Sequence, residues 1–198
     1  VMLLLSLVVT YLIPLPNRRV CLGLALTALP LILVYPSAKR WFPYPQAILA
    51  LCWGFAVLIP WAAIQGNLNG GIPMICCWMA TLLWTFGFDT VYAMSDRHED
   101  QELGLQSSAL SLGKNALNAV SISYGLSSLF SAIAGLNAGV NWLFWPFWLT
   151  ASLGMQKETF NLKDKNNLSI NGAYGKHFKH QVWLGGLLML GLMVGRVN

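Results

Sequence analysis

The sequence predicts an all-α membrane protein, a polytopic bundle of transmembrane helices around a central cavity. Of its 198 residues, 56 % are hydrophobic and only 10 % are charged. The mean hydropathy is +0.57, and apolar segments alternate with short turn-forming stretches. Soluble domains carry about 25 % charged residues. We therefore expect residues 1–198 to form a single domain embedded in a lipid bilayer.

Seven apolar segments are the candidate helices. They cover residues 1–13, 20–35, 45–64, 72–95, 115–134, 142–155 and 180–197. The stretches between them, such as PSAKRWFPYP and QGNLNGGIP, are rich in Pro, Gly and Asn, which favour turns. A spanning helix needs about 20 residues. We therefore expect the shorter segments to extend into their loops, the stretch 157–176 to be a polar connection, and residues 1–13 to be part of a longer helix.

Lysine and arginine fall unevenly on the two sides of this bundle. One side receives nine of them and the other receives three, and cytoplasmic loops normally carry the excess. The nine-residue side is therefore predicted to be cytoplasmic. The net charge of +5 does not indicate nucleic-acid binding, because the basic residues form no continuous stripe. The nine are Lys39, Arg40, Arg97, Lys114, Lys157, Lys163, Lys165, Lys176 and Lys179, and the three are Arg18, Arg19 and Arg196.

The acidic residues concentrate in one stretch, DTVYAMSDRHEDQELG at 89–104, which contains five of the seven. If this stretch is one helix, Asp89, Asp96 and Asp100 stand at i, i+7 and i+11 and share a face. Carboxylate oxygens suit Mg²⁺, which characteristically recruits substrate phosphates. Ionisable residues near membrane depth are costly and so are functional candidates. The alternative is a solvated helix end with scattered charge.

Basic residues are predicted at the same end of the bundle as these acids. Tyr35 and Lys39 stand at i, i+4 at the end of the second segment, and Arg40 follows directly. These residues could simply anchor the helix by reaching toward lipid headgroups. Together with the acids, however, they suit a bound diphosphate. A polyprenyl diphosphate would place its head at this rim and its tail among the apolar helices.

Two stretches carry a resemblance to a known family. DTVYAMSDRHEDQELGLQSSAL and the preceding YPSAKRWFPYPQ resemble the UbiA superfamily of intramembrane prenyltransferases, in particular the 4-hydroxybenzoate polyprenyltransferases of quinone biosynthesis. Asp96 and Asp100 match the family's DxxxD motif, and Tyr35 and Lys39 match its YxxxK motif. The resemblance implies a nine-helix bundle in which two Asp-rich motifs hold Mg²⁺ against the prenyl diphosphate.

The resemblance also implies a role for each candidate residue. Asp96 and Asp100 would be the metal ligands and, with Asp89, the catalytic residues. Asp89 would orient the aromatic acceptor or take its proton. The expected substrate-binding residues are Lys39 for the diphosphate, Arg40 for the diphosphate or the benzoate carboxylate, and Tyr35 and Arg97 from the two motifs.

One departure from the family pattern concerns its other Asp-rich motif. No Asp or Glu precedes Asp89 in this sequence. We therefore expect the chain to lack that motif and the first two helices, to hold about seven of nine helices, and to be inactive alone.

The predicted function is transfer of a polyprenyl group from polyprenyl diphosphate to the ring of 4-hydroxybenzoate, for a quinone of the ubiquinone or plastoquinone type. The expected location is the bacterial inner membrane, with the site facing the cytoplasm. Two alternatives stay open. The acceptor could be homogentisate, dihydroxynaphthoate, chlorophyllide or haem, or the chain could be a cation-transporting bundle without enzymatic activity.

The three histidines are expected to lie outside this site. His98 is predicted to be solvated. His177 and His180 are predicted to mark the wet start of the last helix rather than to bind a metal, because no carboxylate neighbours them in the sequence.

Overall fold

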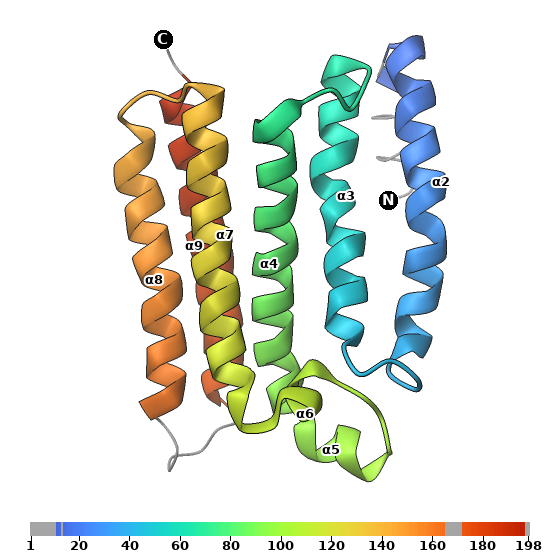
Figure 1. Cartoon of the computed structure of the whole chain (residues 1–198), viewed down its shortest axis with the longest axis vertical. Helices are drawn as coiled ribbons and strands as arrows, with labels where there is room; N and C mark the ends of the chain where they lie inside the picture. The colour runs from blue at the N-terminus through green and yellow to red at the C-terminus, as the bar shows by residue number, and fades with distance from the viewer. Residues whose placement is uncertain (1–10, 13, 165–171, 197–198) are drawn as a thin grey trace.

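The described part of the chain is helical and arranged as a row of long helices. The computed structural model describes residues 11–12, 14–164 and 172–196. Figure 1 shows the long helices side by side, running alternately up and down, with short helices gathered at one end. The long helices are α2 (Leu15–Ala38), α3 (Pro45–Gln65), α4 (Gly71–Ser95), α7 (Ala116–Ala138), α8 (Phe144–Asp164) and α9 (Ala173–Gly195). The short ones are α5 (Arg97–Glu102), α6 (Ser108–Leu112) and the 3₁₀ helix η1 (Gly113–Asn115).

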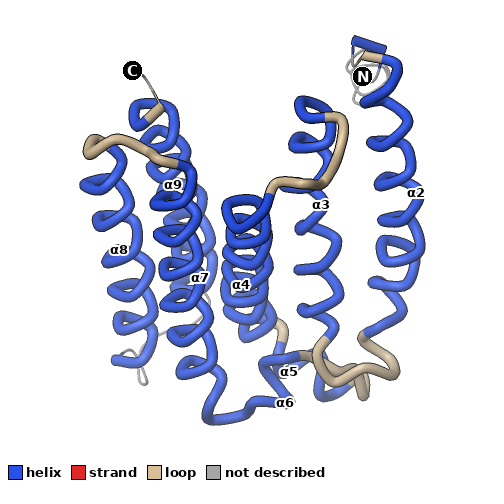
Figure 2. The backbone as a smooth tube through the Cα atoms, turned by 45° about the horizontal axis from the view of Figure 1, so that its top comes forward, coloured by secondary structure: helices blue, strands red, loops and turns tan. Residues whose placement is uncertain are grey.

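Helix α4 is the central element of this row. It packs against α3 on one side and against α7 and α9 on the other, while α2 packs on α3 and α8 packs on α7 and α9. The tube in Figure 2 shows the same neighbours from a second direction. Gly87 allows α4 and α7 to approach closely, because a Cβ there would lie 2.5 Å from Cε1 of Tyr124. The buried core beside this contact contains Val91, Val120, Tyr124 and Met155.

The helices carry the apolar surface expected of an integral membrane protein. Among the described residues, four segments are long and apolar enough to cross a membrane, namely Leu15–Ala38, Pro45–Gln65, Gly71–Ser95 and Ser108–Ala138. In lipid, a backbone must satisfy its own hydrogen bonds, which these helices do. Large apolar side chains such as Leu33, Ile64 and Ile122 are exposed on their outer faces. The chain is therefore an integral membrane protein built from helices, as predicted.

Several predicted boundaries differ from the observed ones. The segment predicted at 1–13 lies outside the described residues apart from Tyr11 and Leu12. Helix α2 begins five residues before the predicted segment, α7 continues to Ala138, and α9 begins at Ala173. Helix α8 continues to Asp164, so the first part of the predicted connection 157–176 is helical. Hydropathy marked only the apolar parts of these helices, whereas their ends are polar and still hydrogen-bonded.

The prediction that residues 89–104 form one helix is wrong. Helix α4 ends at Ser95, and Asp96 adopts φ −95° and ψ 4° before α5 begins. The Ser95 hydroxyl donates to the Tyr92 carbonyl and to the Asp96 carboxylate. Such local side-chain bonds compete with a helical backbone. Asp89, Asp96 and Asp100 therefore do not share one helical face.

Candidate functional site

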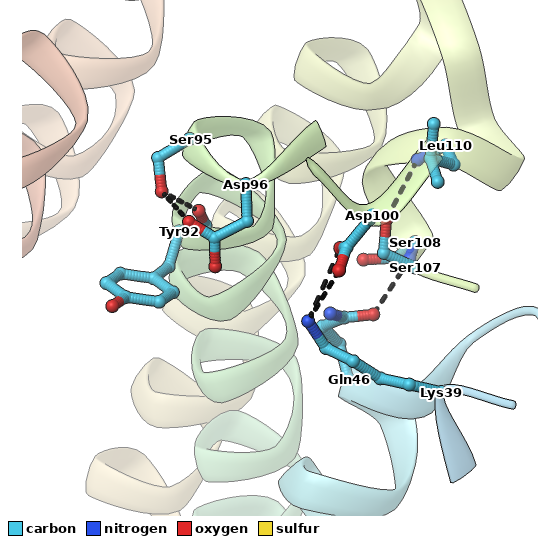
Figure 3. Close-up of polar contacts among 9 residues, drawn as sticks. All are labelled: Lys39, Gln46, Tyr92, Ser95, Asp96, Asp100, Ser107, Ser108 and Leu110. Carbon is cyan, nitrogen blue, oxygen red and sulfur yellow. Dashed lines mark hydrogen bonds and ion pairs between the residues drawn. The ribbon is translucent and has the colours of Figure 1, made fainter. Parts of the chain in front are cut away.

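The clearest polar contact in the described bundle joins the two sequence motifs. Nζ of Lys39, just past the end of α2, lies 3.0 Å from Oδ1 and 3.3 Å from Oδ2 of Asp100 on α5. Figure 3 shows the Asp100 carboxylate directed at this ammonium group. Asp100 is only 3 % exposed. A buried carboxylate requires a cation or hydrogen-bond donors, and Lys39 supplies the cation.

A set of hydrogen bonds holds the segment carrying Asp100 against the α2–α3 connection. Each bond joins groups far apart in the sequence, so together they define how the α5–α6 segment lies on the bundle. They run from the Gln106 amide to the Lys39 carbonyl, from the Ser108 amide to Oε1 of Gln46, and from the Ser111 hydroxyl to the Pro43 carbonyl. The Ser108 hydroxyl also pairs with that of Thr90 on α4.

The remaining candidate acids lie near this ion pair without joining it. Asp96 is half-buried at the α4–α5 junction, where its Oδ1 accepts a 2.9 Å bond from Ser95. In Figure 3 its carboxylate lies beside Ser95 and Tyr92, whereas Asp100 turns toward Lys39. Asp89 is half-buried on α4 and makes no ion pair with another described residue. Lys39 and Asp96 nevertheless lie close enough for their charges to interact with the Asp89 carboxylate.

Tyr35 extends this group of residues one turn along α2. Tyr35 is half-buried, and Asp89 on α4 lies close enough for its charge to interact with the Tyr35 hydroxyl. Tyr35, Lys39 and Asp89 therefore lie within electrostatic range of one another.

The two candidate arginines lie apart from the carboxylates. Arg40 is exposed in the turn after α2 and forms no ion pair with any residue that the structure describes. Arg97 is exposed at the start of α5, and it lies close enough to Tyr174 of α9 for its charge to interact with that hydroxyl. The structure therefore brings Lys39, but neither arginine, into contact with an acid of the DxxxD motif.

The histidines follow the predictions only in part. His98 is exposed and pairs with Glu102, and His180 is exposed and pairs with Glu158 at 3.0 Å. His177, predicted to lie at a wet helix start, is instead 1 % exposed. Its Nε2 lies 2.8 Å from the Tyr124 hydroxyl. The prediction for His177 was wrong because Tyr124 of α7 stacks on its ring, a contact that the sequence of α9 alone cannot indicate.

The carboxylates of the DxxxD motif are the candidate ligands for Mg²⁺. Among the described residues, no three His, Cys, Asp or Glu side chains gather into a metal site. Asp96 and Asp100 are one turn apart, since the Asp100 amide donates to the Asp96 carbonyl at 2.8 Å. Mg²⁺ is commonly held by one or two carboxylates together with waters and substrate phosphates. The donor chemistry of the pair fits such a site, but in this structure the Asp100 carboxylate is directed at Lys39 and the Asp96 carboxylate at Ser95, so both would have to turn to share an ion.

Sequence reasoning missed the polar residues that support this region. Gln46 is 2 % exposed and Ser108 is fully buried, and their hydrogen bond measures 2.8 Å. A signal was present in the sequence, because Gln46 is a polar residue in the first turn of an otherwise apolar helix. Its partner lies 62 positions away, so the pairing itself could not be found from the pattern.

The chain is similar in sequence to known proteins. Residues 1–185 match the profile of the UbiA prenyltransferase family. The chain is 38 % identical over 172 residues to a 4-hydroxybenzoate solanesyltransferase of Synechocystis sp., covering 87 % of this chain and 58 % of that protein. It is 33 % identical over 187 residues to a 4-hydroxybenzoate octaprenyltransferase of Burkholderia vietnamiensis, covering 93 % of this chain and 61 % of that protein. It thus spans about three fifths of the length of these relatives.

A solved structure shows the same fold. The structure of a digeranylgeranylglyceryl phosphate synthase superposes with a TM-score of 0.71 over 98 % of this chain and 66 % of the other. The two sequences are 18 % identical in this comparison, so the likeness concerns the arrangement of helices.

Proposed function

The chain belongs to the UbiA prenyltransferase family, and from that membership we propose that it acts in the transfer of a polyprenyl group from polyprenyl diphosphate to the ring of 4-hydroxybenzoate. Two relatives from different bacteria are named for this same acceptor and for two different polyprenyl groups. The shared acceptor supports 4-hydroxybenzoate, and the product would enter a quinone of the ubiquinone or plastoquinone type.

The observation that carries this proposal is the contact between Lys39 and Asp100. It brings a cation suited to phosphate and a carboxylate suited to Mg²⁺ to one place at the end of the bundle. When substrate and metal bind, Lys39 and Asp100 would separate from each other. Lys39 would donate to diphosphate oxygens, and Asp100 would share the metal with Asp96.

The roles of the other residues follow from their positions. When bound, Mg²⁺ would supply positive charge to the departing diphosphate. The bond between the prenyl carbon and the diphosphate oxygen breaks with its electron pair on oxygen, and the ring carbon beside the hydroxyl forms the new bond. Asp89 would accept the proton that the ring loses. Tyr35, Arg40 and Arg97 would complete the binding of the diphosphate and the benzoate carboxylate, and the apolar helices would exclude water.

The distribution of cations supports a site on the cytoplasmic side of the membrane, and we place the protein in a bacterial inner membrane because the named relatives are bacterial. Lys39 and Arg40 follow α2, Arg97 begins α5 and Lys114 lies in η1, whereas Arg18 lies in the first turn of α2 and Arg196 follows α9. Figure 1 shows the last turn of α2 at the end that carries α5 and α6, and the start of α2 and the end of α9 at the opposite end. This asymmetry is the one expected when the first end faces the cytoplasm.

A transfer assay with the full-length protein tests the proposal. Proteoliposomes would receive labelled polyprenyl diphosphate, Mg²⁺ and one acceptor at a time, either 4-hydroxybenzoate, homogentisate or dihydroxynaphthoate. We expect labelled product with 4-hydroxybenzoate and its loss after chelation of Mg²⁺. Transfer to one of the other acceptors but not to 4-hydroxybenzoate would refute 4-hydroxybenzoate as the acceptor. Cation flux without transfer to any acceptor would favour the transport alternative.

A further inference from the structure

A groove lies between α8 and α9, outside the site described above. Its volume is about 330 Å³, and it is lined by Gly154, Lys157, Glu158, His180, Trp183 and Leu184. Gly154 shapes its floor, because a Cβ at this position would lie 2.5 Å from Cδ2 of Leu184. Trp183 forms one wall and is 78 % exposed. The groove therefore opens on the outer surface of the described bundle.

The polarity of both helices changes at the level of this groove. Helix α8 is apolar up to Met155 and then continues as QKETFNLKD, while α9 begins as AYGKHFKHQ and becomes apolar from Val182. Polar and apolar halves of two adjacent helices thus meet at one depth. In a bilayer this is the depth where headgroups give way to acyl chains, and tryptophan is typical there. Trp183 stands directly at the boundary.

The charges in the groove are arranged to leave one cation available. Nδ1 of His180 lies 3.0 Å from Oε2 of Glu158, so a protonated His180 offsets the charge of this acid. Lys157 is exposed and makes no ion pair with another described residue. Lys176 precedes His180 by four residues and is also exposed, so it adds positive charge one turn closer to the polar end.

We propose that this groove binds an anionic glycerophospholipid. The phosphodiester lies against the Lys157 ammonium group, and an acyl chain lies along Gly154, Leu184 and Trp183. Basic pockets between membrane helices bind anionic headgroups in this way. A protonated His180 offsets the charge of Glu158, which would otherwise repel the phosphate beside Lys157. The site shares no residue with the Lys39–Asp100 region and does not depend on the proposed reaction.

Native mass spectrometry of the purified chain tests this assignment. The protein would be incubated with an equimolar mixture of phosphatidylglycerol and phosphatidylcholine, and the bound lipids counted. We expect the unmodified chain to retain phosphatidylglycerol over phosphatidylcholine by about fivefold, the preference that one basic residue near the headgroups provides. Lys157→Ala should abolish most of this preference, and Lys157→Arg should restore it.

Lys163→Ala is the matched control. Lys163 lies on the same helix but does not line the groove, and its ammonium group contacts the ring of Phe160. It should leave the lipid preference unchanged. Equal retention of the two lipids by the unmodified chain, or an equal loss in Lys163→Ala, would overturn the proposal. So would disulfide-linked pairs of a Lys157→Cys variant in membranes, because a second copy of the chain would then occupy the groove.

Discussion

The side-chain carbonyl of Gln46 accepts a 2.8 Å hydrogen bond from the backbone amide of Ser108, and both residues are buried. Through this bond the first turn of α3 holds the start of α6, which follows the segment carrying Asp100. The position of the candidate metal ligand therefore depends on a residue that has no role in the chemistry itself.

Replacing Gln46 should weaken the whole α5–α6 segment. Gln46→Ala leaves the buried Ser108 amide without an acceptor, which costs about 1–3 kcal/mol. We expect a lower unfolding temperature in detergent and faster hydrogen exchange at residues 97–112. Gln101→Ala is the control, because Gln101 is exposed on α5. Equal destabilisation by the two variants would show that the Gln46 bond contributes nothing specific.

The Lys39–Asp100 pair should behave as a coupled unit. Lys39→Met leaves a buried carboxylate without its cation and is expected to cost about 2 kcal/mol of stability. Adding Asp100→Asn should recover part of that loss, because the uncompensated charge is removed. A double-mutant cycle on unfolding free energies measures this coupling. Arg40→Met should have little effect, and strictly additive losses at Lys39 and Asp100 would contradict the coupling.

The carboxylates of the DxxxD motif should be required for transfer by the full-length enzyme. An amide binds Mg²⁺ poorly, so Asp96→Asn or Asp100→Asn should lower kcat by about 10²-fold or more. Raising the Mg²⁺ concentration should recover part of the activity. Glu99→Gln tests an exposed acid between them and should keep near-normal turnover. Normal turnover of both Asp variants at limiting Mg²⁺ would refute the metal assignment.

The close approach of α4 and α7 can be tested with two glycines. In Gly87→Ala the new methyl group would lie 2.5 Å from the Tyr124 ring, so overpacking should cost about 1–3 kcal/mol. Gly186→Ala on α9 meets nothing within 4 Å and should be neutral or slightly stabilising. Unfolding temperatures of the two variants provide the measurement. A tolerated Gly87→Ala would mean that Tyr124 moves aside without cost.

The sequence by itself determined the helical membrane architecture and the end of the bundle where the acids lie. Both follow from local properties. Long apolar segments must form hydrogen-bonded helices in lipid, and Pro- and Gly-rich stretches separate them. Helices that alternate in direction then place Lys39 and residues 96–100 at the same end. The motifs also led to the correct family.

Only the tertiary structure decided which of these residues meet. Lys39 rather than Arg40 reaches Asp100, which lies 61 positions away, because the hydrogen bonds of Gln106 and Ser108 hold α5 and α6 over the end of α2. The break at Asp96 and the burial of His177 under Tyr124 were likewise invisible in the pattern. Helical periodicity describes one element at a time, whereas each of these features depends on side-chain bonds or on the packing of a distant helix.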